Sequence, residues 1–89
     1  MTDVQTQISV TVRYFAAAKA AAGRDAEVLT LAAGATVGDL VGALSARSAD
    51  LARVLVRCSY LNDAVAVRSL DTVLLPGQIV DVLPPFAGG

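Results

Sequence analysis

Residues 8–14 are ISVTVRY, a stretch in which apolar and polar side chains alternate. A period of two sends successive side chains to opposite faces of a β-strand, so this stretch predicts a strand with one buried face. Near the other end of the chain, residues 78–83 (QIVDVL) predict a second strand, which leads directly into Pro84 and Pro85. Because proline has no N–H to donate, we expect the ladder of strand hydrogen bonds to stop at this pair.

Between these strands the sequence predicts two helices. Residues 16–22 (AAAKAAA) are rich in alanine, the best helix former, and Gly23 stands where a helix commonly ends. A longer helix is expected after Thr36, a typical N-cap that forms a capping box with Asp39. Its apolar face follows the helical spacing i, i+3, i+4, i+7 and consists of Val37, Leu40, Val41 and Leu44.

Shorter patterns complete the order of elements. Further strands are predicted at residues 27–31, 57–61 and 65–67, and a helical turn at residues 51–55 with Asp50 as its cap. Asn62-Asp63 and Pro76-Gly77 predict turns, the second with glycine at positive φ, while residues 70–75 are ambiguous. This order predicts an α+β domain: a mixed sheet of about five strands with one main helix packed on one face.

Length and composition limit the functions open to the chain. Its 89 residues suffice for one domain, and a 55% hydrophobic, 17% charged composition is typical of a globular protein. A net charge of −1 excludes strong electrostatic binding to nucleic acid or to an anionic membrane. No apolar run approaches the roughly 20 residues of a membrane span. We therefore expect neither a nucleic-acid nor a membrane partner.

The scarcity of histidine and cysteine narrows the chemistry further. The sequence has no histidine and a single cysteine, Cys58, so an intrachain disulfide and most zinc sites are excluded, as is a histidine general base. Residues 1–7 are polar and lack the basic flank and apolar block of a secretory signal. These features predict a cytoplasmic protein with no metal and no bound cofactor.

The sequence ends in Gly88-Gly89. Glycine has no Cβ, so two such residues can pass through a narrow channel and leave a terminal carbonyl open to a nucleophile. The two prolines before them fix φ and predict a stiff, extended arm. Chemistry on the α-carboxylate is one interpretation of this ending. A frayed terminus without a task, the usual condition of chain ends, is the other.

Several motifs occur together in an order that resembles the MoaD and ThiS group of sulfur carriers, and within it the small subunit of molybdopterin synthase. They are VRYFA at residues 12–16, ATVGDL at 35–40, LND at 61–63, LLPG at 74–77 and LPPFAGG at 83–89. The resemblance covers residues 8–89. It implies a ubiquitin-like β-grasp domain at residues 8–83, preceded by a disordered segment at residues 1–7 and followed by a flexible tail at residues 84–89.

The resemblance implies that Gly89 is the working residue. An adenylating, MoeB-like enzyme would join its carboxylate to AMP from ATP, and sulfur from a persulfide would displace AMP to leave a C-terminal thiocarboxylate. A MoaE-like large subunit would supply the catalytic groups and use that sulfur to build the dithiolene of molybdopterin on cyclic pyranopterin monophosphate. The residues that would enter its channel are Pro84, Pro85, Phe86, Ala87 and Gly88.

The same resemblance assigns an apolar docking surface around the tail to Phe15, Val65 and Leu83. Phe15 is out of phase with the buried face of its strand, so we expect an exposed aromatic side chain beside the tail. Ordinary core packing of all three residues is the alternative.

Two features depart from the family's pattern. Gln78-Ile79 stand where acidic residues are usual, with Asp81 keeping part of that charge, and Phe86 is bulkier than the common valine.

For five other side chains, a purely structural role is weighed against a functional one. Arg13 is expected on a solvated strand face rather than paired with a partner carboxylate, and Cys58 is expected to be a buried, inert thiol rather than a sulfur relay. Tyr14 and Tyr60 are expected to pack with hydrated hydroxyl groups. Lys19 is the only lysine, so a self-linked isopeptide polymer would have one possible site.

Three other functions stay open at this level. A sulfur carrier could serve a different acceptor, such as an activated serine in cysteine synthesis or the thiazole of thiamine, although the two prolines resemble the molybdopterin branch. A ubiquitin-like modifier would form isopeptide bonds with lysines of its targets. A structural β-grasp module would bind partners without any chemistry at its tail.

Overall fold

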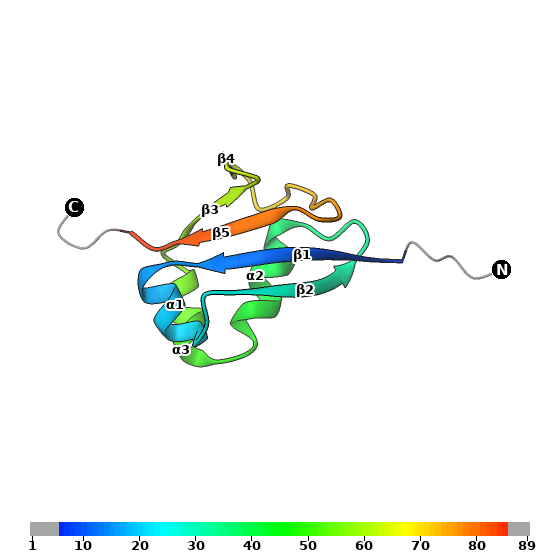
Figure 1. Cartoon of the computed structure of the whole chain (residues 1–89). Coiled ribbons are helices and arrows are strands. Elements are labelled where there is room, and N and C mark those ends of the chain that lie inside the picture. Colours follow the sequence, from blue (N-terminus) through cyan, green and yellow to red (C-terminus); the bar gives the residue numbers. More distant parts are fainter. Residues whose placement is uncertain (1–5, 86–89) are drawn as a thin grey trace.

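The computed structural model describes residues 6–85, which form a five-stranded sheet and three helices (Figure 1). In chain order the elements are β1 (Gln7–Tyr14), α1 (Ala16–Ala22), β2 (Ala26–Ala32), α2 (Val37–Ser45), α3 (Ala49–Leu55), β3 (Ser59–Asn62), β4 (Val65–Ala66) and β5 (Ile79–Leu83). The alternation of ISVTVRY corresponds to β1, and the alanine-rich segment corresponds to α1. Both predictions are confirmed.

Two parallel strands occupy the middle of the sheet. The strand order is β2-β1-β5-β3-β4, in which β1 and β5 are parallel and the other neighbours are antiparallel. Thr11 lies opposite Ile79, and Tyr14 lies opposite Val82. Because β1 and β5 point the same way, the start of β1 and the end of β5 lie at opposite ends of the sheet (Figure 1). The predicted ubiquitin-like β-grasp architecture, of the α+β class, is confirmed.

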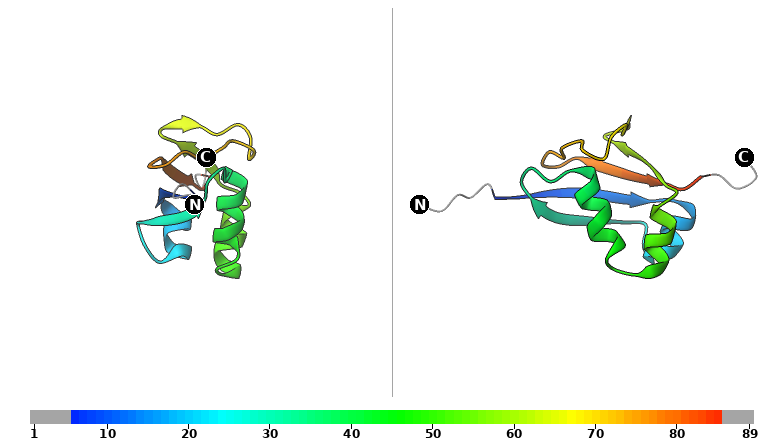
Figure 2. Two further views of the ribbon diagram at one scale, coloured as in Figure 1. Left: turned by 90° about the vertical axis from the view of Figure 1, so that its right-hand side faces the viewer. Right: turned by 180° about the vertical axis from the view of Figure 1, so that it is seen from behind.

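A single apolar layer joins the sheet to its helices, which cover one face (Figure 2, right). The fully buried side chains in it are Val10, Val12, Val80 and Val82 from the strands, Val37, Leu40, Leu44 and Leu51 from the helices, and Leu74 from the loop before β5. Burying one such side chain contributes about 1.5–3 kcal/mol. The fully buried side chains that the sheet contributes to the core therefore come from its two central strands.

The predicted capping box fixes the start of α2. Thr36 Oγ1 accepts a hydrogen bond from the backbone N–H of Asp39 at 3.1 Å, and the Asp39 carboxylate accepts one from the N–H of Thr36 at 2.9 Å. Thr36 also forms an isolated antiparallel bridge with Val73. The ambiguous residues 70–75 are thus a loop that pairs with the start of this helix rather than a strand of the sheet.

The predicted cap of α3 was wrong. Ser48 caps this helix, because its Oγ accepts a hydrogen bond from the N–H of Leu51 at 3.1 Å. Asp50 lies in the first turn instead, where a negative charge is favourable beside the helix N-terminus. Strand β1 begins one residue earlier than predicted, at Gln7, inside the segment that was expected to be disordered, because Gln7 pairs with Ala32.

The turn between β3 and β4 is also displaced from its predicted place. It consists of Asp63 and Ala64, both at positive φ (48° and 67°), rather than Asn62 and Asp63. Two central residues at positive φ match the twist of antiparallel strands in a hairpin. Asn62 is instead the last residue of β3 and pairs with Val65.

A polar cluster joins β1, β2 and the residues after α2. The Glu27 side chain, only 8% exposed, accepts hydrogen bonds from the Tyr14 hydroxyl at 2.5 Å and from Arg47 Nη1 at 2.6 Å. Burial alone would raise the pKa of the Glu27 carboxyl, but the bonds from Arg47 and Tyr14 outweigh it, so this pKa lies below its ordinary value. Burial and the bond to Glu27 raise the pKa of the Tyr14 hydroxyl. That hydroxyl is therefore bonded within the protein, and the prediction of a hydrated group was wrong.

We expect Glu27→Gln to remove the stabilisation that this carboxylate contributes as an anion. Because its folded-state pKa is lowered, that contribution is complete above the ordinary glutamate value of 4.5 and is lost as the pH falls below it. The variant should be less stable than the wild type by about 1 kcal/mol near pH 7, and the difference should shrink towards about pH 3. Urea unfolding at both pH values measures this, and an unchanged difference would contradict the assignment.

Candidate functional site

Strand β5 carries the chain to the predicted tail. Leu83 is its last residue and is half-buried, Pro84 is buried, and Pro85 is exposed. Pro84, the expected first residue of the free arm, thus lies in the folded body, because it lines a groove against α1 and α3. The remaining tail residues, Phe86, Ala87, Gly88 and Gly89, lie outside the described residues. The reactive role of Gly89 stays a prediction.

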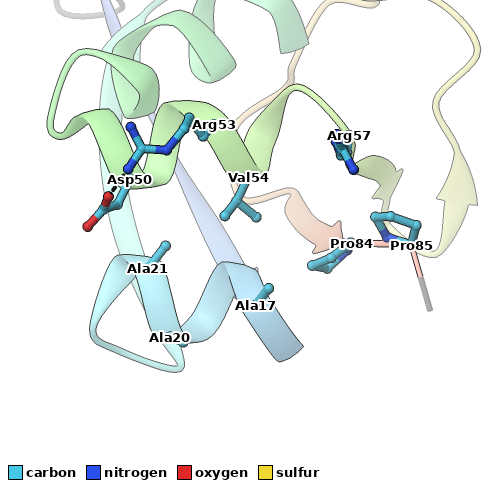
Figure 3. Close-up of a pocket in the computed structure, with 9 residues that line it drawn as sticks. All are labelled: Ala17, Ala20, Ala21, Asp50, Arg53, Val54, Arg57, Pro84 and Pro85. Atoms are coloured by element: carbon cyan, nitrogen blue, oxygen red, sulfur yellow. Dashed lines mark hydrogen bonds and ion pairs between the residues drawn. The ribbon is translucent and has the colours of Figure 1, made fainter. Parts of the chain in front are cut away.

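A groove of about 550 Å³ opens beside the two prolines, between α1 and α3 (Figure 3). Its apolar walls are formed by Ala17, Ala20 and Ala21 of α1 and Val54 of α3. The ion pair of Asp50 with Arg53 lies at one end, and Arg57 lies beside the prolines at the other. The sequence did not predict this groove, because the alanines alone indicate only helix propensity and not which helix they would face.

The parallel register brings two of the three predicted docking residues together. Tyr14 and Val82 are register partners, so the residues that follow them, Phe15 and Leu83, lie next to each other where the chain leaves the sheet. Phe15 is 40% exposed, as the sequence predicted. Both side chains continue the alternation of their strands and belong to the sheet face opposite the helices, which is the face turned to the viewer in Figure 1.

Val65 is not part of this cluster. It lies on β4, two strands from β5, and it is 68% exposed. Its register partner Asn62 pairs in turn with the core residue Val80, so Val65 stands on the helix side of the sheet, at its edge. A docking surface made of Phe15, Val65 and Leu83 is therefore not one continuous patch in the folded chain. The alternative prediction, that Val65 packs in the core, is also wrong, because its side chain is exposed.

Arg13 and Asp81 form an ion pair beside Phe15 that the sequence did not predict. Arg13 Nε donates to one carboxylate oxygen of Asp81 at 2.5 Å and Nη2 donates to the other at 2.8 Å. The bond to Asp81 raises the pKa of the Arg13 guanidinium. Arg13 was expected on a solvated strand face, and Asp81 was expected to keep part of the charge of the missing acidic residues. The exposed position of Arg13 on the strand face is confirmed, since its side chain is 49% exposed, but its pairing with Asp81 was not predicted. Asp81 is only 5% exposed and is bonded to Arg13, because the register places the two residues directly opposite each other.

Comparison with known proteins now identifies the family. The model of the ThiS family matches residues 12–89. The chain belongs to the ThiS family. No curated protein matches it in sequence.

Solved structures agree with this family assignment. A protein from Pyrococcus furiosus assigned as molybdopterin converting factor subunit 1 is 29% identical, with a TM-score of 0.80 over 89% of this chain and 99% of that one. SAMP1, the small archaeal modifier protein 1 of Haloferax volcanii, is 26% identical, with a TM-score of 0.79 over 91% and 99%. A Helicobacter pylori structure containing subunits 1 and 2 of molybdopterin-converting factor matches at 23% identity and a TM-score of 0.72 over 92% and 100%, which shows the shared fold. The chain is thus a small ubiquitin-like protein of the ThiS and MoaD sulfur-carrier type.

In this ThiS-family chain Gln78 has a structural task. Its Oε1 accepts hydrogen bonds from Asn62 Nδ2 at 2.9 Å and from the N–H of Leu75 at 2.8 Å, which ties β3 to the turn before β5. The turn itself contains Gly77 at a φ of 80°, so the prediction of positive φ there is confirmed. An amide in this position supplies the acceptor without adding negative charge at the start of β5. No local signal in the sequence points to this bond, which depends on the pairing of β3 with β5.

Two remaining side chains show how little acid–base chemistry the described part of this chain offers. Burial raises the pKa of the Cys58 thiol, whose Sγ donates to the carbonyl oxygen of Val54 at 3.3 Å. Cys58 is half-buried rather than fully buried. The Tyr60 hydroxyl donates to the carbonyl oxygen of Leu55 at 3.0 Å, and burial raises its pKa to about 12. Its predicted hydration was therefore also wrong.

Residues 6–85 contain no cluster of three or more histidine, cysteine, aspartate or glutamate side chains able to hold a metal ion. Within the same range, no helix has the length and apolar character needed to cross a membrane.

We expect Cys58 to react slowly with iodoacetamide in the folded protein. Its raised pKa keeps the thiolate fraction small, and only the thiolate is a strong nucleophile. Alkylation followed by mass spectrometry near pH 8 should be at least about tenfold slower for the native chain than for the same chain in urea. Equal rates would contradict the inert-thiol assignment.

Proposed function

We propose that this chain is the small, sulfur-donating subunit of a molybdopterin synthase, with Gly89 as the residue that carries the sulfur. The observation that supports this most is the family match, which runs through the tail to residue 89. The described structure adds a body whose last strand leads into Pro84 and Pro85. The Pyrococcus furiosus relative, named as a molybdopterin converting factor subunit, favours this branch of the family.

The proposed chemistry is acyl activation followed by sulfur exchange. The Gly89 carboxylate attacks the α-phosphorus of ATP on a partner enzyme, and pyrophosphate leaves. The terminal sulfur of a persulfide then attacks the acyl carbon, and AMP leaves with the electron pair of the broken C–O bond. A second thiol cleaves the resulting S–S bond, so that the chain keeps a terminal thiocarboxylate. That sulfur is donated to cyclic pyranopterin monophosphate.

This division of labour agrees with the side chains at the root of the tail. The ionisable groups that line the groove beside the prolines, Asp50, Arg53 and Arg57, include an internal ion pair and permanently charged guanidinium groups, which are poor proton-transfer catalysts. The chain therefore contributes the reacting group and its position, and the partner contributes acid–base and electrostatic catalysis. No cofactor bound to the chain is needed for these steps, since ATP is used by the activating enzyme.

Two partners follow from the proposal. The first is an adenylating and sulfur-transferring enzyme of the MoeB-like kind. The second is a MoaE-like large subunit, and the Helicobacter pylori complex of subunits 1 and 2 supports this pairing. Phe15 and Leu83 form the part of the predicted docking surface that lies beside the tail, so we assign them to contact with the large subunit.

A ubiquitin-like modifier is the second candidate, and the likeness to SAMP1 favours it. In that role the activated Gly89 would be attacked by a lysine of a target protein. The single lysine of this chain, Lys19, lies on α1 with its Nζ 2.7 Å from a carboxylate oxygen of Asp25. Self-linked polymers would therefore be limited to one site. A carrier that serves another acceptor, in cysteine or thiazole synthesis, shares the thiocarboxylate and differs only in the second partner.

Mass spectrometry of the intact chain, purified from its own host, distinguishes these candidates. The proposal predicts a population in which one oxygen is replaced by one sulfur, located on the C-terminal peptide. Adducts on lysines of other proteins, without that sulfur form, would support the modifier. If neither form appears even with the host's activating enzyme and ATP supplied, the sulfur-carrier chemistry is wrong.

Deleting Gly89 should abolish sulfur loading and leave the fold intact. The residue follows the last described element by several positions, so the described core does not depend on it. Thermal unfolding should therefore shift by no more than about 4 °C, since a surface change alters stability by roughly 0.5 kcal/mol or less. Deleting Met1 instead is the matched control, and it should leave both loading and stability unchanged. A large loss of stability, or loading without Gly89, would contradict the assignment.

A further inference from the structure

The ion pair of Arg13 with Asp81 is exposed on one side only. Asp81 is 5% exposed as a residue, whereas the Arg13 side chain is 49% exposed. The carboxylate is therefore covered by its neighbours, and the guanidinium forms the surface. Both residues lie on the open face of the sheet, next to the strand end from which the tail continues.

Among the described residues 6–85, Arg13 is held in one orientation and keeps donors that no other group accepts. A guanidinium carries five N–H groups, and the two bonds to Asp81 use two of them, from Nε and Nη2. The ring of Phe15 lies with its centroid 5.9 Å from the guanidinium carbon, close enough for a cation–π contact. Three N–H groups thus remain on a planar group that is fixed at its inner edge by a carboxylate and flanked by an aromatic ring.

Within the described part of the chain, the surroundings of this pair carry no net charge. Leu61 lies opposite Asp81 in the register of β3 with β5, and Leu83 follows two residues after it on the same face. The other charged side chains of this corner, Lys19 and Asp25, form an ion pair with each other. A partner surface therefore finds apolar side chains and a neutral ion pair here, without a net charge to attract an oppositely charged patch.

A partner that covers this face must supply suitable hydrogen-bond acceptors for Arg13. A purely apolar surface would leave the three free N–H groups of Arg13 without acceptors, and a buried unsatisfied donor is costly. A carboxylate would place a second negative charge close to Asp81 in a site shielded from water, where like charges are costly. A neutral oxygen, from a backbone carbonyl, a hydroxyl or a side-chain amide, satisfies the donors without either cost.

We propose that Arg13 is a specificity-determining residue for the protein that accepts the tail, which contacts the free Arg13 N–H groups with neutral oxygen acceptors. The inference rests on the proposed function, in which that protein is the large subunit of the synthase. The contact is continuous with Phe15 and Leu83 at the root of the tail. Asp81 is a positioning residue, because it fixes the guanidinium and neutralises it.

The test is the dissociation constant of the full chain with its host's large subunit, measured by titration calorimetry. The double variant Arg13→Leu/Asp81→Ala removes both charges together, so neither is left unpaired, and it should stay folded in a thermal melt. We expect its dissociation constant to rise about tenfold, because the partner's acceptors then face an apolar side chain. Arg68→Leu, the same change on the loop after β4, is the matched control and should bind like the wild type.

The outcomes separate the inference from the function on which it rests. Equal or tighter binding of the folded double variant, with normal binding of the wild type, overturns the role of Arg13 alone. A strong loss of wild-type affinity between about 0.05 and 0.5 M NaCl would indicate a charged acceptor and overturn the neutral one. Failure of the wild type itself to bind the large subunit overturns the proposed function, and the inference with it.

Discussion

The parallel pairing of β1 with β5 is the contact on which the other features of this protein depend. It joins residues 11–14 to residues 79–82, from opposite ends of the chain, and makes them the two central strands of the sheet. The valines of both strands form the sheet side of the core, and α2 packs against them. The same pairing fixes where the chain leaves the fold. A segment that must enter another protein's active site benefits from a rigid origin, since misplacing a reacting group is costly in rate.

The two faces of this strand pair have different tasks. On the helix side, alternate residues are apolar and buried, which supplies stability. On the open side, the register sets Arg13 opposite Asp81 and brings Phe15 next to Leu83. An ion pair with one buried carboxylate contributes little net stability, since desolvation offsets much of its attraction. Its position at the root of the tail is better explained by recognition than by folding.

Much of the fold followed from local patterns in the sequence. The alternation in residues 8–14 and the capping box at Thr36 and Asp39 each require only neighbouring residues, and both were predicted correctly. The contacts of Arg13 with Asp81, which are 68 positions apart, depend on a register that no local pattern contains. Ser48 was missed as a cap because Asp50, two residues later, is an equally good capping residue type.

The candidate site also combines features that follow from local sequence with features that depend on long-range contacts. The chemistry proposed for Gly89 comes from the sequence alone, because two glycines after two prolines form a local motif. The positions of the residues around the tail could not be predicted from the sequence. The placement of Val65 on the helix side of the sheet follows from the two-residue turn at Asp63 and Ala64. The burial of Pro84 follows from the packing of α1 near α3.

The central claim is that Gly89 carries a sulfur atom that a pterin acceptor receives. The direct measurement uses the chain prepared with a terminal thiocarboxylate, mixed with its host's large subunit and cyclic pyranopterin monophosphate. Intact-mass spectrometry follows the chain while the pterin is analysed for sulfur. The account predicts that the chain returns to its carboxylate mass as sulfur appears in the pterin, two chains being consumed for each dithiolene. A chain that keeps its sulfur in this mixture, but loses it to an activated serine or a thiazole precursor, would contradict the account.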